Sequence, residues 1–169
     1  LFFITSLPTT TLWRTNLTAT GTKKVVDLTI AGRTGSSGPF PLAPFGSKIL
    51  FSATDGRSGG ELWQTNGFSN GTALLKNLNP GSASSNPDSF TSLGSRLLFV
   101  AFDDEHGDEL WQTNGTSGGT SFIEDLRPGT SSSGITGLTV LNSVGYFSAN
   151  DGTSTELWRS DGTAIGTYR

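Results

Sequence analysis

Cysteine and methionine are both absent from this chain of 169 residues. Without cysteine, the protein has no disulfide framework, no thiolate nucleophile and no metal site built on cysteine sulfur. Because the chain does not begin with methionine, we expect it to be a processed protein or a segment of a longer one.

Charge is also scarce, since Asp, Glu, Lys and Arg make up only 15% of the residues and the net charge is −3. This balance offers no basic face for phosphate groups, so we expect no nucleic-acid partner. No apolar run approaches the ~20 residues of a membrane-spanning helix, so we expect no membrane insertion. A cysteine-free composition rich in Thr, Ser and Asn favours an extracellular or cell-surface location.

What the chain does contain is a seven-residue stretch that recurs four times. The sequence ELWQTNG occupies residues 61–67 and 109–115, and looser copies are ELWRSDG at 156–162 and TLWRTNL at 11–17. Every tryptophan belongs to this series, with spacings of 50, 48 and 47 residues: Trp13, Trp63, Trp111 and Trp158. A Gly-Thr pair begins eight residues after each tryptophan, and a phenylalanine lies ten to twelve residues before it. A register this long indicates a repeat protein.

The best-preserved unit predicts four β-strands, because β-branched and aromatic residues are separated by turns rich in Gly and Asn. The strands are expected at 89–93, 97–102, 109–113 and 120–126. Links within the unit are short, which predicts an antiparallel meander, and the link to the next unit is longer. The pattern therefore predicts an all-β fold, a β-propeller of four-stranded antiparallel blades of about 48 residues. One domain, 1–169, would hold about four blades, the first incomplete, at approximately 1–30, 39–79, 88–127 and 135–169.

The repeated stretch itself is interpreted as structural. Its Leu and Trp are expected to pack between adjacent blades, because tryptophan is large enough to fill a wedge-shaped gap. Asn66, Asn114 and Asp161 are expected to cap the following turn by accepting hydrogen bonds from backbone N–H groups. A ligand-binding role for the stretch in every blade is the less favoured alternative.

These residues resemble the ELWxxDGT repeat family of large secreted bacterial proteins. The closest match is ELWRSDGTAIGT at 156–167, and DLRPG from Asp125 and SANDGTSTELW from Ser148 are similar to the flanking segments. Asn66 and Asn114 stand where the family has Asp, and the first copy departs further, with Thr and Leu in place of the first Glu and the last Gly. The resemblance implies a propeller-like fold and an extracellular setting. It implies no established reaction.

Catalysis is not expected. His106, in the loop DDEHGD, is the only histidine of the chain, and no GxSxG elbow accompanies it for a Ser-His-Asp triad. The recurring carboxylates could suit glycoside hydrolysis, but they are equivalent positions of a repeat and an active site normally breaks that symmetry. We therefore expect that the protein is not an enzyme.

Five carboxylates in seven residues form the one candidate metal site. Hard cations such as calcium prefer oxygen clusters of this kind, although the spacing is not that of an EF-hand loop. A solvated acidic loop is the favoured interpretation, so no cofactor is expected beyond this candidate. The candidate calcium ligands are Asp103, Asp104, Glu105, Asp108 and Glu109.

Three sequons are candidate glycosylation sites, because each lies in a predicted surface turn. The acceptor residues are Asn16, Asn70 and Asn114, and the Ser- and Thr-rich loops are candidate acceptors of O-linked sugars. We expect at least one attached carbohydrate in native material.

The ends of the chain predict self-association. The first blade lacks its innermost strand, and the last blade stops as its fourth strand begins. A strand from a neighbouring molecule would complete a blade, and head-to-tail addition of this kind propagates a filament. We therefore expect a non-enzymatic extracellular structural or adhesive module, the repeating subunit of a fibre or surface layer. The alternative is a multivalent, lectin-like carbohydrate-binding propeller.

Overall fold

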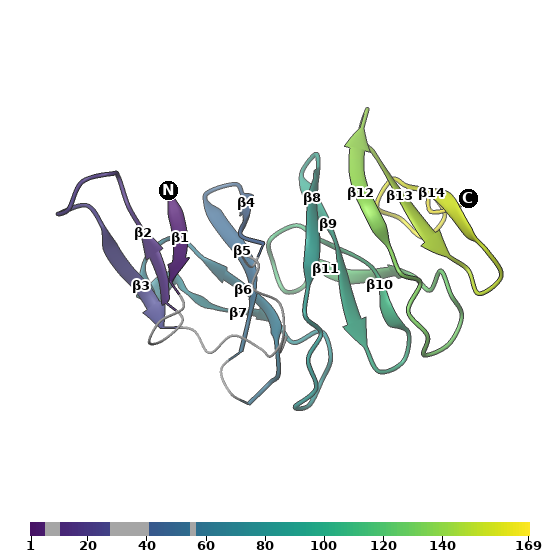
Figure 1. Ribbon diagram of the computed structural model, residues 1–169, viewed down its shortest axis with the longest axis horizontal. Helices are drawn as coiled ribbons and strands as arrows, with labels where there is room; N and C mark the ends of the chain where they lie inside the picture. The colour runs from purple at the N-terminus through teal and green to yellow at the C-terminus, as the bar shows by residue number, and fades with distance from the viewer. Residues whose placement is uncertain (6–10, 28–40, 55–56) are drawn as a thin grey trace. The chain divides into compact units, whose positions relative to one another are not determined.

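The computed structural model describes residues 1–5, 11–27, 41–54 and 57–169, and every sheet in them is antiparallel (Figure 1). The chain divides into two compact units, Leu1–Asn86 and Pro87–Arg169, and each unit holds two sheets. Among the described residues, no helix is long and apolar enough to cross a membrane.

The first unit contains a three-stranded and a four-stranded sheet, each a meander in which consecutive strands pair. The first sheet comprises β1 (Phe2–Thr5), β2 (Thr11–Arg14) and β3 (Lys23–Asp27). The second comprises β4 (Ala43–Phe45), β5 (Lys48–Ala53), β6 (Glu61–Thr65) and β7 (Ala73–Lys76), with one 3-10 turn, η1 (Ser69–Gly71), between β6 and β7.

The second unit has the same plan, with four strands followed by three. The third sheet comprises β8 (Asp88–Leu93), β9 (Arg96–Asp103), β10 (Gly107–Thr113) and β11 (Thr120–Glu124). The fourth comprises β12 (Thr136–Leu141), β13 (Val144–Asn150) and β14 (Thr155–Ser160). A single bridge pairs Arg159 with Tyr168 beyond the last strand.

The predicted all-β class, the antiparallel meander and the strand count of each repeat are confirmed. The strand expected at 120–126 ends at Glu124, because the N–H of Leu126 bonds a glutamate side chain instead of a neighbouring strand. Over the described part of the chain, each strand pairs only with strands of its own sheet, and no closure into a propeller is detected.

Strand register explains why a phenylalanine precedes each tryptophan at a nearly constant distance. The two residues are directly opposite each other on adjacent strands in all four sheets, so their side chains lie on the same face of the sheet. The pairs are Phe3 with Trp13, Phe51 with Trp63, Phe99 with Trp111, and Phe147 with Trp158. The register to the following strand shifts between the Leu and the Trp of the first three copies, so the repeated stretch also includes a bulge.

The core of each unit lies between its two sheets. In the first unit, Leu12 and Val25 of the first sheet cluster with Phe51 and Ala53 of the second. The second unit repeats this arrangement, since its third and fourth sheets pack together through one buried cluster that includes Leu98, Val100, Leu110, Phe147 and Ala149. The predicted packing role of the tryptophans is seen where Trp63 and Trp158 pack against these clusters.

We predict that Trp111→Ala lowers the free energy of unfolding by about 3–5 kcal/mol, because truncation leaves a cavity. Trp111 is only 6% exposed, and its indole N–H donates to the carbonyl of Ala101. Urea unfolding of the variant and the parent measures the difference. The control is Ile165→Ala, which removes a side chain that is 95% exposed and should change stability by less than about 0.5 kcal/mol. Equal midpoints for Trp111→Ala and the parent would show that the packing role is wrong.

Candidate functional site

A hydrogen bond between two hydroxyl side chains closes the turn after each copy of the repeated stretch. Each pair lies 2.7 Å apart: Thr15 with Thr22, Thr65 with Thr72, Thr113 with Thr120, and Ser160 with Thr167. In the third copy, the hydroxyl of Thr120 donates to the carbonyl of Thr116, and Oγ1 of Thr113 accepts from the N–H of Gly115. The same four-group relay occurs in the other copies, so its donors and acceptors are satisfied locally.

The residue after the first hydroxyl caps the same turn. Oδ1 of Asn114 accepts from the N–H of Thr116 at 3.0 Å, and Oδ1 of Asp161 accepts from the N–H of Thr163 at 3.0 Å. Asn16 and Asn66 make the equivalent bond, so the predicted capping role is confirmed for Asn66, Asn114 and Asp161. Because Asn and Asp make the same bond, this position needs an acceptor oxygen and not a charge.

The cap also explains the glycine that always lies eight residues after tryptophan. A Cβ at Gly119 would lie 2.0 Å from Oδ1 of Asn114, which is far inside van der Waals contact. The same overlap occurs in every copy, at Gly21, Gly71 and Gly166. The constant Gly-Thr pair is therefore a packing requirement, in which Gly makes room for the capping side chain and Thr completes the hydroxyl pair.

The glutamate of the repeated stretch is buried, and sequence reasoning missed this. Glu109 accepts hydrogen bonds from the N–H of Leu126 at 3.2 Å and of Ser133 at 2.9 Å. Glu61 accepts equivalent bonds from the N–H of Leu78 at 2.6 Å and of Ser85 at 3.1 Å. Both carboxylates are fully buried. Each carboxylate thus holds the connector that leaves the last strand of its sheet.

A signal for this interaction was present in the sequence. Ser85 and Ser133 each lie 24 residues after their glutamate, within the Gly- and Ser-rich connectors. A second pair of residues has the same spacing in each connector. Oγ of Ser132 accepts a hydrogen bond from the N–H of Asp108, and Oγ of Ser84 accepts one from the N–H of Gly60. We name each buried glutamate with its connector bonds a connector clasp.

The connector clasp is seen at the second and third copies of the repeated stretch. Glu156 is exposed and accepts a hydrogen bond from the hydroxyl of Ser154 at 2.9 Å. Thr11 stands in the first copy, and its hydroxyl donates to Asp27 at 2.9 Å. The clasp is therefore a feature of the second and third sheets.

Burial controls the protonation of the clasp carboxylates. Loss of hydration raises the pKa of Glu109 to about 7, and hydrogen bonds from Ser133 and Leu126 offset only part of this shift. Burial likewise raises the pKa of Glu61, against the hydrogen bonds from Ser85, Leu78 and Asn79. Both carboxyl groups therefore hold a proton more strongly in the folded protein than in the unfolded chain.

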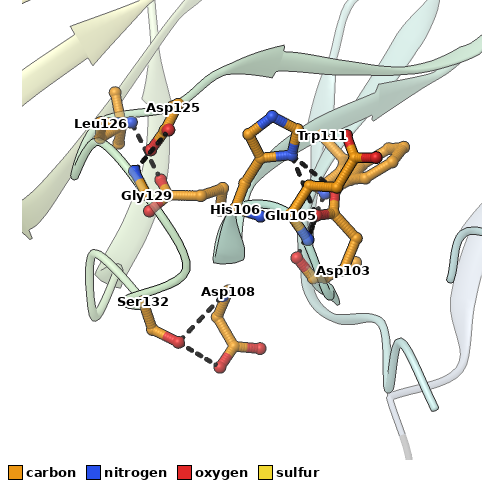
Figure 2. Close-up of polar contacts among 11 residues, drawn as sticks. Asp103, Glu105, His106, Asp108, Trp111, Asp125, Leu126, Gly129 and Ser132 are labelled. Carbon is orange, nitrogen blue, oxygen red and sulfur yellow. Dashed lines mark hydrogen bonds and ion pairs between the residues drawn. The ribbon is translucent and has the colours of Figure 1, made fainter. Parts of the chain in front are cut away.

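The acidic loop is organised by its own hydrogen bonds (Figure 2). Oδ1 of Asp103 accepts from the N–H groups of Glu105 at 2.9 Å and of His106 at 2.7 Å. Nδ1 of His106 lies 2.9 Å from the same oxygen, and this hydrogen bond to Asp103 raises the pKa of His106. The His106 ring also stacks on Phe122, with centroids 4.4 Å apart.

The five candidate calcium ligands are not brought together around one point. Asp108 accepts a hydrogen bond from the hydroxyl of Ser132 at 2.9 Å, away from Asp103 (Figure 2), whereas Glu109 is buried in its clasp. Asp104 and Glu105 are exposed. In the part of the chain that the structure describes, no three Asp, Glu or His side chains group to hold a metal ion. Calcium binding at this loop stays a prediction.

The three candidate glycosylation residues are exposed, as expected of acceptors. Asn16 and Asn114 each accept bonds at Oδ1 from the N–H and hydroxyl of the sequon threonine. Asn70 lies in η1 and is not the residue whose side chain caps the turn. The attachment of sugars to these residues stays a prediction.

A hollow of about 390 Å³ lies in the first unit, at the turn after β2. Its lining includes the cations Arg14 and Lys23 and the amides Asn16 and Asn66. The Arg14 guanidinium lies 4.2 Å from the centre of the Phe68 ring, which orients it by a cation–π contact. The hollow has the polar and cationic groups that bind carboxylates or sulfates.

No family model matches this chain, and no curated protein is significantly similar to it. The resemblance to the ELWxxDGT repeats therefore stays a prediction that rests on the motif.

We predict that Gly119→Ala destabilises the protein by about 1–3 kcal/mol, because the new methyl group would displace the Asn114 cap. Gly118→Ala is the matched control in the same turn, since a Cβ there meets nothing within 4 Å. Thermal and urea unfolding of the two variants measures the difference. Equal stability of the two alanine variants would contradict the packing role of this glycine.

We predict that the free energy of unfolding falls as the pH rises from about 4.5 to about 7. The pKa of Glu109 is about 7 in the folded protein, against an ordinary value of 4.5, so the folded state binds the extra proton across this window. By linkage, the loss that Glu109 contributes reaches roughly 3 kcal/mol and levels off above about pH 7. Urea unfolding at several pH values measures the slope.

Glu109→Gln tests the assignment of this pH dependence. The substitution removes the titrating group, so the slope between about pH 4.5 and 7 should flatten even though the variant is less stable overall. Glu156→Gln is the control, since that equivalent glutamate is exposed and outside a clasp. An unchanged slope in Glu109→Gln would assign the pH dependence to other groups.

Proposed function

We propose that this protein is a non-enzymatic, extracellular structural module built from propeller-type blades, which serves as the repeating subunit of a fibre or surface layer. The observation that carries the proposal is the use of the repeated polar side chains. The hydroxyl pairs, the Asn or Asp caps and the clasp glutamates all bond the turns and connectors of their own sheets. The recurring polar side chains thus stabilise the fold of their own sheets.

The blade interpretation is supported within each unit. Each sheet is a meander with the same Phe–Trp register, and the two sheets of a unit share one apolar core. Face-to-face packing of similar meanders is how propeller blades associate. The ELWxxDGT resemblance and the cysteine-free composition support the extracellular setting.

Charge segregation supports head-to-tail self-association. Residues 1–86 contain seven Lys and Arg and three Asp and Glu, a net charge of +4, whereas residues 87–169 contain four and eleven, a net charge of −7. Opposite charges on the two halves favour contact between unlike ends of two molecules and disfavour contact between like ends. Among the described residues, β1 also pairs only with β2, so its other edge is available to a further strand.

We expect that the purified chain forms concentration-dependent oligomers, which grow longer as the ionic strength falls from about 0.5 M to about 0.01 M. Sedimentation velocity measures the size distribution, and electron microscopy of the low-salt sample shows whether the assembly is a filament. A protein that remains monomeric at every concentration and salt level would contradict the structural-subunit proposal.

The hollow beside Arg14 favours a second candidate function, the binding of acidic sugars. Its two cations would pair with carboxylate or sulfate groups, and its amide and hydroxyl groups would bond sugar hydroxyls. A glycan array with the parent and with Arg14→Ala separates the two functions. Binding of acidic glycans by a monomer, lost in Arg14→Ala, supports the lectin-like alternative, whereas assembly without sugar binding supports the structural module.

A further inference from the structure

Equivalent residues of the four repeats differ sharply in burial at one position. The leucine of the repeated stretch is 0% exposed at Leu12, Leu62 and Leu110, but 69% exposed at Leu157 of the fourth sheet. A second position behaves in the same way, because Leu93 in the third sheet is 7% exposed and its equivalent Leu141 in the fourth is 62% exposed. The fourth sheet thus exposes two leucines on a face whose equivalent in the third sheet is buried.

The packing inside each unit shows what covers this face elsewhere. In the first unit, Leu12 lies in one cluster with Phe51 and Ala53 of the following sheet. In the second unit, Leu110 lies in one cluster with Phe147 and Ala149 of the following sheet. The leucine face of one sheet therefore packs against the phenylalanine face of the next. We call these the Leu face and the Phe face.

The Phe face of the first sheet is less buried than the equivalent faces of the other three sheets. Phe51, Phe99 and Phe147 are fully or almost fully buried, whereas their equivalent Phe3 is only half-buried. The ring of Phe3 stacks on Trp13, with centroids 6.3 Å apart and planes within 7°. The stacked pair is therefore a preformed apolar surface. The Leu face at Leu157 and the Phe face at Phe3 correspond to the two halves of the interface that each unit forms internally.

We propose that the Leu face of the fourth sheet binds the Phe face of the first sheet on a second copy of this chain. The proposal rests on the self-association proposed above and names its two surfaces. The internal interfaces show that such faces fit each other, and the charges of the two halves, −7 and +4, favour this pairing over contact between like ends. Because the two surfaces differ, the contact is heterologous, and it propagates as a filament when the rotation between successive copies does not close a ring.

The first test is Leu157→Asp, which places a charge at the centre of the proposed contact. It should weaken association of the full chain about 100-fold in sedimentation velocity, because the charge would be buried against aromatic rings. The matched control is Ile165→Asp, which adds the same charge to the turn after β14. This position is exposed in all four repeats: Thr20, Asn70, Gly118 and Ile165. The control should associate like the parent.

The second test mixes two variants, each of which keeps one intact face. Leu157→Asp retains its Phe face, and Phe3→Asp retains its Leu face, so each should be monomeric alone and the mixture should stop at the dimer. Phe3→Ala, which is milder, replaces Phe3→Asp if circular dichroism shows that the latter does not fold, and it should weaken association at least about tenfold.

The outcomes separate this inference from the proposed function. Dimers in the mixture and monomers in the separate variants establish the contact. Filaments that form equally well with Leu157→Asp would overturn the contact but leave the structural function intact, and would point to strand addition at β1. A parent protein that is strictly monomeric, with the two faces closed on each other in one molecule, would overturn both.

Discussion

The connectors between sheets depend on one interaction, the buried carboxylate that accepts hydrogen bonds from their backbone. A connector has no neighbouring strand, so its N–H groups would be costly to bury without another acceptor. Glu61 and Glu109 supply that acceptor and are themselves fully buried. The exit of the chain from each of these sheets is therefore held by a side chain of a central strand.

The turn after the repeated stretch satisfies a more local constraint. Its hydroxyl pair, its capping Asn or Asp and its Gly lie within a few residues of one another, so all four copies build the same turn even where the rest of the motif has changed. The first copy illustrates this tolerance, since Leu17 adopts a φ of 71° where the other copies have Gly. The hydrogen bonds of this turn are thus preserved in the first copy, which has no clasp glutamate.

Packing between sheets has a longer range, and within each unit it covers one face of each of the two sheets. Each sheet offers a Leu face and a Phe face, and only a neighbouring sheet can cover them. A repeat of this kind requires a terminal cap, closure on itself or a partner, because an exposed apolar face is an association site. The exposed Leu157 and the half-buried Phe3 make this general requirement specific to this chain.

Sequence alone determined the features that depend on residues close together in the chain. Alternation and turn chemistry over fewer than about fifteen residues account for the strands, for the meander order and for the pairing of Phe opposite Trp. They also account for the capping role of Asn66, Asn114 and Asp161. These short-range patterns allow few alternatives, so they could be predicted without coordinates. The pairing of Glu109 with Ser133 was missed because it spans 24 residues and passes through a connector with no regular period.

Tertiary structure alone decided how neighbouring acidic residues are used. Asp108 and Glu109 are adjacent in sequence, but successive side chains of a strand point to opposite faces of the sheet. Glu109 is therefore buried in the clasp, Asp108 accepts a hydrogen bond from the Ser132 hydroxyl, and these two carboxylates, which are neighbours in the sequence, are used separately. Likewise, four equivalent leucines look alike in the sequence. Packing of the following sheet in the same unit makes Leu12 and Leu110 core residues, whereas Leu157 is at the surface.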